Sequence, residues 1–210
     1  MDIVNPQVEE YMGSLLARHD EPVLLEMEAE GRERGFPIIG RLCGVALELH
    51  ARAVGARRVF ELGSGFGYSA YWFCRAVGPG GEVHGTDGDP ANEPKALDYL
   101  GRAGFGDLVR WHVGDALERL AAADGEFDVV FCDIDKTGDP DAWRAARERI
   151  RVGGVYLCDN TLGTGRGTVL DEGSWFEAIR EHNRLVAEDE RYLSFINPTR
   201  EGLLTALRVS

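Results

Sequence analysis

Acidic side chains follow two apolar runs in the second half of the chain, and together they could bind a metal ion. Asp133 ends the run 127–133, and Asp159 ends the run 155–159 and is followed by Asn160. Neighbouring parallel strands lie about 4.8 Å apart and end at one sheet edge, so these three side chains can converge. Their oxygens favour magnesium, manganese or calcium over zinc. The alternative is that each acid merely caps the helix after it.

A lysine stands next to this group, in the segment Asp133-Ile134-Asp135-Lys136. An amine beside a cation site can accept a proton, because the positive charge of the cation lowers the pKa of the lysine. The alternative is a surface lysine that pairs with Asp135 or Asp139. The acids and Lys136 together favour a reactive site over a set of unrelated caps.

A second candidate site is the glycine-rich segment 61–69, Glu-Leu-Gly-Ser-Gly-Phe-Gly-Tyr-Ser. It follows an apolar run and opens a helical stretch, which is where ligands bind an open α/β sheet. Its spacing is G-x-G-x-G, so the dinucleotide fingerprint G-x-G-x-x-G is not met. Asp87 ends the next run, and its carboxylate could accept hydrogen bonds from a ribose. A turn made only for packing, with Asp87 as a helix cap, is the alternative.

These residues need a parallel sheet to bring them together, and the chain has the corresponding pattern. Its apolar runs are continuous rather than alternating, as expected of strands covered on both faces. Helices between them are predicted to start at Asp89-Pro90 and Asp139-Pro140, where an acid caps a first-turn proline, and to stop at 78–81 and 153–154. The predicted strands are 59–62, 82–86, 108–113, 127–133 and 155–159, followed by a hairpin of 193–197 and 203–209.

The first quarter of the chain is helical by its pattern. Asn5-Pro6 caps a helix whose apolar residues recur at helical spacing, a second helix runs from Pro22 to Gly35, and a third ends at Gly55. We therefore expect a single domain over 1–210, with a helical cap at 1–55 and an α/β core at 56–210. The core is predicted to be a doubly wound, mainly parallel sheet of Rossmann-like type with an antiparallel carboxyl-terminal hairpin.

Glu61 before the glycine turn completes the pattern E-x-G-x-G-x-G, and here the sequence resembles the class I S-adenosylmethionine (SAM) methyltransferases. Gly114-Asp115-Ala116 is similar to the loop on the adenine side of the cofactor in that family. Asp115 could also cap the helix that starts near Ala116. The resemblance implies a SAM site built from Glu61, Gly63, Ser64, Gly65, Tyr68, Ser69, Asp87, Asp115, Ala116 and Asp133.

From about Pro37 to the end, the resemblance narrows to the metal-dependent O-methyltransferases, which include catechol and caffeoyl-CoA O-methyltransferases. It rests on FELGSGFGYSA, GTDGDP, FDVVFCDIDK, GGVYLCDN and NPTREGLLTALR. It implies that Asp133, Asp159 and Asn160 bind a divalent cation, with magnesium favoured, and that Lys136 is the general base. It also implies a seven-stranded sheet, an acceptor that is a small aromatic bearing a hydroxyl, and a homodimer.

The sequence departs from that family at three places that shape the acceptor site. Gly163 stands where relatives often carry tryptophan, and 137–140 lacks a frequent tyrosine. No counterpart of the catechol-binding glutamate is found near Ser194-Phe195. Phe36, Trp143 and Trp175 could line a pocket, although aromatic residues at helical spacing are more often core. The identity of the acceptor is therefore left open.

Composition excludes several other classes of protein. The formal charge of -13 disfavours a nucleic-acid partner, since such proteins need a basic surface. Four cysteines without a C-x-x-C pair predict reduced core residues and a cytoplasmic protein, and the absence of a long apolar run predicts no membrane association. The competing functions are a nicotinamide-dependent dehydrogenase, which the glycine spacing disfavours, and a non-catalytic SAM-binding protein.

Overall fold

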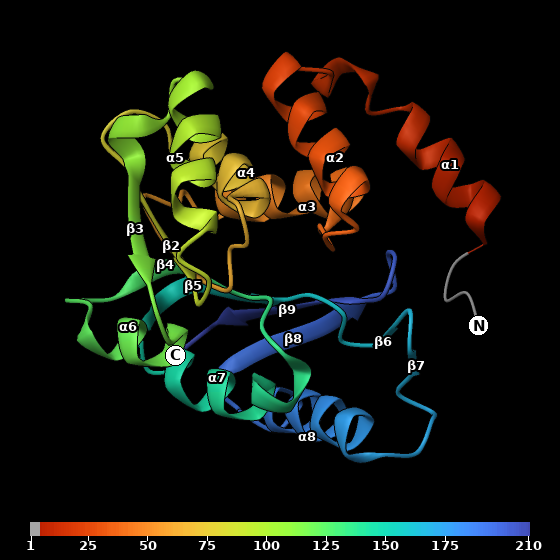
Figure 1. Ribbon diagram of the computed structural model, residues 1–210. Helices are drawn as coiled ribbons and strands as arrows, with labels where there is room; N and C mark the ends of the chain where they lie inside the picture. Colours follow the sequence, from red (N-terminus) through yellow and green to blue (C-terminus); the bar gives the residue numbers. More distant parts are fainter. Residues whose placement is uncertain (1–4) are drawn as a thin grey trace.

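The centre of the computed structural model, which describes residues 5–210, is a seven-stranded sheet (Figure 1). Its strand order is β3-β2-β1-β4-β5-β9-β8, with β1 to β5 parallel and both β8 and β9 antiparallel to their neighbours. The predicted Rossmann-like sheet with an antiparallel hairpin is confirmed. The strands are β1 (Arg58–Leu62), β2 (Glu82–Asp87), β3 (Val109–Val113), β4 (Phe127–Cys132), β5 (Ile150–Cys158), β8 (Tyr192–Asn197) and β9 (Leu203–Arg208).

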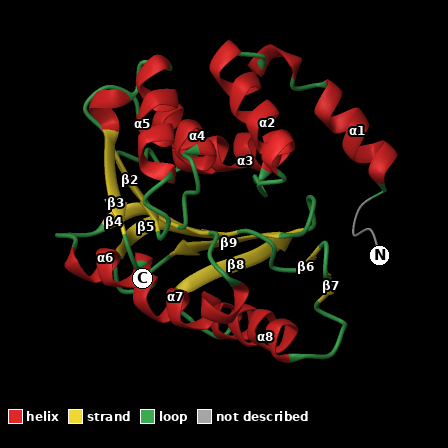
Figure 2. Cartoon of the chain, viewed as in Figure 1, coloured by secondary structure: helices red, strands yellow, loops and turns green. Residues whose placement is uncertain are grey.

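Helices cover both faces of the sheet, as Figure 2 shows. One layer contains α1 (Pro6–Ser14), α2 (Pro22–Arg34), α3 (Gly40–Ala53), α4 (Tyr68–Val77) and α5 (Asn92–Arg102). The other contains α6 (Ala116–Ala122), α7 (Asp139–Ala146) and α8 (Ser174–Ala187). Short 3₁₀ turns lie at η1 (Ala17–His19), η2 (Gly106–Leu108) and η3 (Lys136–Gly138), and β6 (Gly163–Thr164) pairs with β7 (Gly167–Thr168). Residues 1–4 of the predicted cap lie outside the described part.

The sheet is buried on both faces because successive strand residues point to opposite sides. In β4, Val129 and Phe131 pack into the core beneath α2 to α4, whereas Val130 and Cys132 pack into the core with α7 and α8. This arrangement explains the continuous hydrophobicity of the strands. All four cysteines are buried and free, as expected of reduced core residues. Across residues 5–210, no helix combines the length and apolar character that spanning a membrane requires.

Several predicted element ends were wrong. Strand β5 begins at Ile150 and runs through Gly153-Gly154, which we expected to be a stop. Gly153 has φ 78°, and the β4–β5 register shifts nearby, so the glycine permits an irregularity inside the strand. Helix α5 begins at Asn92, and the Asp89 carboxylate accepts a hydrogen bond from the Ala91 amide in a turn before it.

Asp139 is also not the predicted helix cap. It is the first residue of α7, Gly138 is the N-cap residue, and the Asp139 side chain is fully buried. The carboxylate turns toward the ends of β4 and β5 instead of toward the amides of the helix. A buried acid therefore stands where the sequence predicted a solvent-facing cap.

Candidate active site

A cleft of about 560 Å³ opens at the carboxyl edge of the sheet, where the loops after β1, β2, β4 and β5 meet. The strand order reverses direction between β1 and β4, and the cleft lies at that point. Ligands usually bind there in such folds. Of the predicted site residues, the cleft is lined by Gly63, Ser64, Gly65, Tyr68, Ser69, Asp87, Asp133, Lys136, Asp159 and Asn160. Phe36 and Trp175 also line it, whereas Trp143 is fully buried in the core.

The glycine turn is fixed to the neighbouring strand ends. The Ser64 amide donates to the Thr86 carbonyl over 2.7 Å, and the Gly65 amide donates to Asp87 Oδ2 over 3.0 Å. Gly63 has φ 83°, and a Cβ there would lie 2.3 Å from the backbone oxygen of Asp133. The turn therefore packs backbone to backbone against the end of β4, which only glycine permits.

The carboxylate of Asp87 is held from three sides. Besides the Gly65 amide, it accepts hydrogen bonds from the Asp89 amide over 2.8 Å and from Asn92 Nδ2 over 3.0 Å. These bonds fix the side chain at the end of β2, beside the glycine turn. The position matches the one at which Rossmann-type folds bind ribose hydroxyls.

Three of the predicted cofactor residues do not line the cleft. Glu61 is fully buried and accepts a hydrogen bond from Ser64 Oγ over 3.0 Å, and burial raises its pKa to about 8. Asp115 caps α6 by accepting from the Glu118 amide over 2.9 Å, and Ala116 is the first residue of that helix. In this structure Glu61 supports the glycine turn from behind and Asp115 supports α6, so direct contact with a cofactor stays a prediction for all three.

Asp133, Asp159 and Asn160 converge at the ends of β4 and β5, as predicted. Burial, together with the nearby charge of Asp133, raises the pKa of Asp159 to about 7. Burial also raises the pKa of Asp133, although Lys136 opposes that shift. A divalent cation fits this donor set, because it would relieve the repulsion between the carboxylates and because Asp133, Asp159 and Asn160 each offer an oxygen.

Lys136 is buried at the floor of the cleft. Its Nζ donates to the Asp159 carbonyl over 3.1 Å, and lies 3.7 Å from both Asp133 Oδ1 and Asp139 Oδ2. Burial lowers the pKa of Lys136, but neighbouring Cys158 and the two carboxylates outweigh it, so the pKa is raised. The alternative of a surface lysine is wrong about exposure, since the side chain is buried, but the pairing with Asp139 that it included is present. Asp135 instead accepts from the Thr137 amide over 3.0 Å at the start of η3.

The turn between β8 and β9 supplies two cleft residues that sequence reasoning missed. Glu201 Oε2 accepts a hydrogen bond from Asn160 Nδ2 over 2.8 Å, which orients the amide oxygen of Asn160 away from Glu201. Arg200, in a left-handed conformation with φ 52°, donates to the Ile38 carbonyl over 3.2 Å. The sequence indicated only a hairpin turn here, because the partners of both residues are remote along the chain.

By its strand order and by the place of its glycine turn, the chain falls in the class of Rossmann-like methyltransferases. The sequence model of the O-methyltransferase family matches residues 28–209. The chain belongs to this family, which sets aside the dehydrogenase alternative.

Individual relatives agree with this assignment. A catechol O-methyltransferase of Mycobacterium tuberculosis is 36% identical over 183 residues, covering 86% of this chain and 82% of the relative. The O-methyltransferase TomG of Streptomyces achromogenes, solved in complex with SAM, is 28% identical with a TM-score of 0.83, covering 97% of this chain and 96% of its own. An O-methyltransferase of Bacillus cereus, solved with SAH, is 25% identical with a TM-score of 0.82, covering 96% and 97%.

Proposed function

We propose that this enzyme transfers the methyl group of SAM to a hydroxyl of a small aromatic acceptor, with a divalent cation and with Lys136 as general base. The observation that carries the proposal is the convergence of Asp133, Asp159, Asn160 and Lys136 in the same cleft as the glycine turn. The names of the relatives support it, since one is a catechol O-methyltransferase and another was solved with SAM.

The cofactor half of the cleft fits SAM through its backbone and one carboxylate. Gly63 and Gly65 allow close approach of the chain, and Asp87 would accept hydrogen bonds from the ribose. Tyr68 and Ser69 would lie near the amino acid end of the cofactor. When bound, SAM supplies a methyl group on a sulfonium.

The metal half fits a hard cation, with magnesium favoured and manganese or calcium as alternatives. Asp133, Asp159 and Asn160 would hold it, and Glu201 would keep the Asn160 amide oriented. A cation bound there would supply positive charge that lowers the pKa of an acceptor hydroxyl and of the Lys136 ammonium.

Lys136 would accept the proton that the acceptor must lose. A phenol has a pKa near 10, like tyrosine, so it is mostly protonated at pH 7. Neutral Nζ of Lys136 would take the proton from the acceptor oxygen, which would leave that oxygen nucleophilic toward the methyl group that SAM supplies when bound. The position of Lys136 at the cleft floor, with Nζ donating to the Asp159 carbonyl, supports this role.

The acceptor side of the cleft is partly aromatic, since Phe36 and Trp175 line it. A flat ring with one hydroxyl or two adjacent hydroxyls suits such a lining. We further propose a cytoplasmic homodimer. Its support is the exposed apolar surface of α1 and the residue after it, where Val8, Tyr11 and Leu15 are largely solvent-exposed.

The test is methyl transfer by Lys136→Ala in a single turnover with saturating SAM and magnesium, using a panel of catechols and other phenols. We expect the chemical step to slow by roughly 10²- to 10⁴-fold, the usual size of a general-base contribution, while SAM affinity stays nearly unchanged. A rate within about threefold of the parent would remove Lys136 as the base. Transfer to no acceptor at all would favour the non-catalytic SAM-binding alternative.

A further inference from the structure

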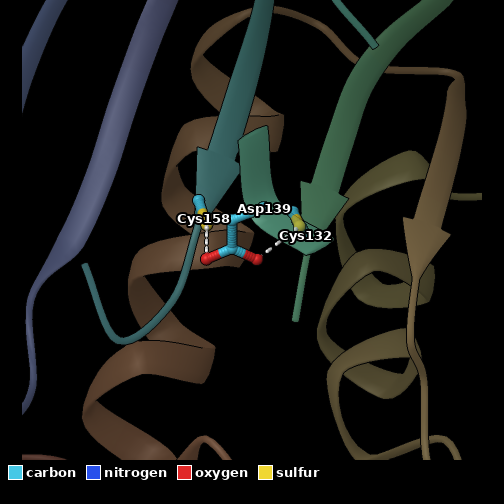
Figure 3. A group of neighbouring side chains, drawn as sticks. All are labelled: Cys132, Asp139 and Cys158. Atoms are coloured by element: carbon cyan, nitrogen blue, oxygen red, sulfur yellow. Dashed lines mark hydrogen bonds between the residues drawn. The ribbon is translucent and has the colours of Figure 1, made fainter. Parts of the chain in front are cut away.

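Beneath the cleft lies a buried cluster that the proposed reaction does not use (Figure 3). Asp139 at the start of α7 points one carboxylate oxygen at each of two thiols. Cys132 Sγ lies 3.5 Å from Oδ1 and Cys158 Sγ lies 3.8 Å from Oδ2. The thiols are adjacent because Cys132 and Cys158 are register partners at the ends of β4 and β5. The cluster therefore has a defined geometry set by the sheet.

A fully buried carboxylate needs more than two thiols, which are weak hydrogen-bond donors. Among residues 5–210, Lys136 is the one lysine or arginine with a nitrogen within 4 Å of the Asp139 carboxylate, at 3.7 Å. Lys136 also faces the cleft, where its Nζ donates to the Asp159 carbonyl. The lysine thus connects the buried cluster to the candidate reaction site.

Two thiols and a carboxylate within 4.8 Å of one another could also bind a soft metal such as zinc. A structural zinc site has four ligands, whereas this group offers three. The protonated amine of Lys136, 3.7 Å from Asp139 Oδ2, cannot supply a fourth ligand, because an ammonium has no lone pair.

We propose that Asp139 is a positioning residue that holds Lys136 Nζ at the floor of the cleft. The proposal rests on the proposed function, since it gives Lys136 its place as the base. The lysine stem has four rotatable carbons, so its amine needs fixed partners to stay in line with a reacting oxygen. Asp139 lies on the core side of the amine, whereas the Asp159 carbonyl and Asp133 Oδ1 lie on the side of the cleft. Asp139 is thus the partner that holds the amine from the core.

A stability cycle tests the pair without any reference to catalysis. Lys136→Met should lower the melting temperature by roughly 6–20 °C, since it leaves Asp139 buried without its cation. Asp139→Asn should lower it in the parent protein but raise it in the Lys136→Met protein, because the second change removes the unpaired acid. Equal effects of Asp139→Asn in the two backgrounds would overturn the pairing. Asp141→Asn, an exposed acid on the same helix, is the matched control and should change little.

A second cycle tests positioning in the chemical step. Asp139→Asn should slow single-turnover methyl transfer roughly 10- to 100-fold and leave SAM affinity unchanged, as expected when a reacting group is misplaced. In the Lys136→Ala protein, the same change should cause no further loss. A loss of equal size in both backgrounds would overturn the positioning role, as would stoichiometric zinc that disappears with Asp139→Asn.

The two proposals fail in different ways. If Lys136→Ala keeps the parent rate, the general-base role fails and Asp139 has no base to position. The sign reversal in melting temperature would still establish the buried pair in that case, and its absence would remove the pair whatever the kinetics show.

Discussion

At the scale of single residues, Asp87 shows how one carboxylate can serve both the fold and a ligand. Its two oxygens accept from the Gly65 amide, the Asp89 amide and Asn92, yet the side chain still lines the cleft. Asp87→Ala should weaken SAM binding roughly 10- to 150-fold, because a hydrogen bond to a charged acceptor contributes about that much to affinity. Calorimetry measures this directly. Unchanged affinity in a folded variant would exclude Asp87, and Asp89→Ala, which does not line the cleft, is the control.

Most residues of the candidate site were predictable from sequence, because strand ends in a parallel sheet share one edge. That rule predicts that Asp133, Asp159, Asn160 and Lys136 lie together, and all four line the cleft. Asp139 was not predictable, since Asp-Pro at a helix start ordinarily predicts a cap. Its observed position depends on the β4–β5 register, which places two thiols beside it.

At the scale of elements, the turn after β1 depends on the absence of a side chain at Gly63. A Cβ on Gly63 would meet the Asp133 backbone oxygen at 2.3 Å in a left-handed conformation. Gly63→Ala should therefore reduce the free energy of unfolding by about 2 kcal/mol or more. Urea denaturation measures the loss. Gly101→Ala is the control, because it lies in α5 with open space around it and should be neutral or stabilising by about 0.5–1 kcal/mol.

The strands were predicted well because continuous apolar runs identify a sheet buried on both faces. Element ends were less predictable. The glycines at 153–154 were predicted to stop the preceding helix, but they lie inside β5 at an irregularity. The β6–β7 pair, made of two Gly-Thr dipeptides, has no apolar pattern to indicate it. Such short pairing is set by the surrounding fold and not by local sequence.

At the scale of the whole molecule, buried Glu61 should make stability depend on pH. Burial raises its pKa to about 8, from an ordinary value near 4.5 in the unfolded chain. The folded protein thus binds the proton of Glu61 more tightly than the unfolded chain does. The resulting contribution to the free energy of unfolding is complete below about pH 4.5. It is lost as pH rises to about 8, at about 1.4 kcal/mol per pH unit.

Glu61→Gln removes that titration while keeping an oxygen for Ser64. The difference in free energy of unfolding between parent and variant should therefore shift against the parent as pH rises from 5 to 8. Chemical denaturation without added cofactor at three pH values gives the difference. Parallel stability curves for the two proteins would show that Glu61 does not titrate in this range.

The central claim is metal-dependent methyl transfer at the joined ends of β4 and β5, and chelation tests it most directly. Transfer of label from SAM to the best catechol or phenol of the panel is measured before and after exhaustive dialysis against EDTA, and again with added magnesium or manganese. We expect turnover to vanish with the chelator and return with the metal in the parent and in Asp135→Asn, but not in Asp133→Asn, which lacks one of the two carboxylates. Turnover that survives the dialysis intact would contradict the account.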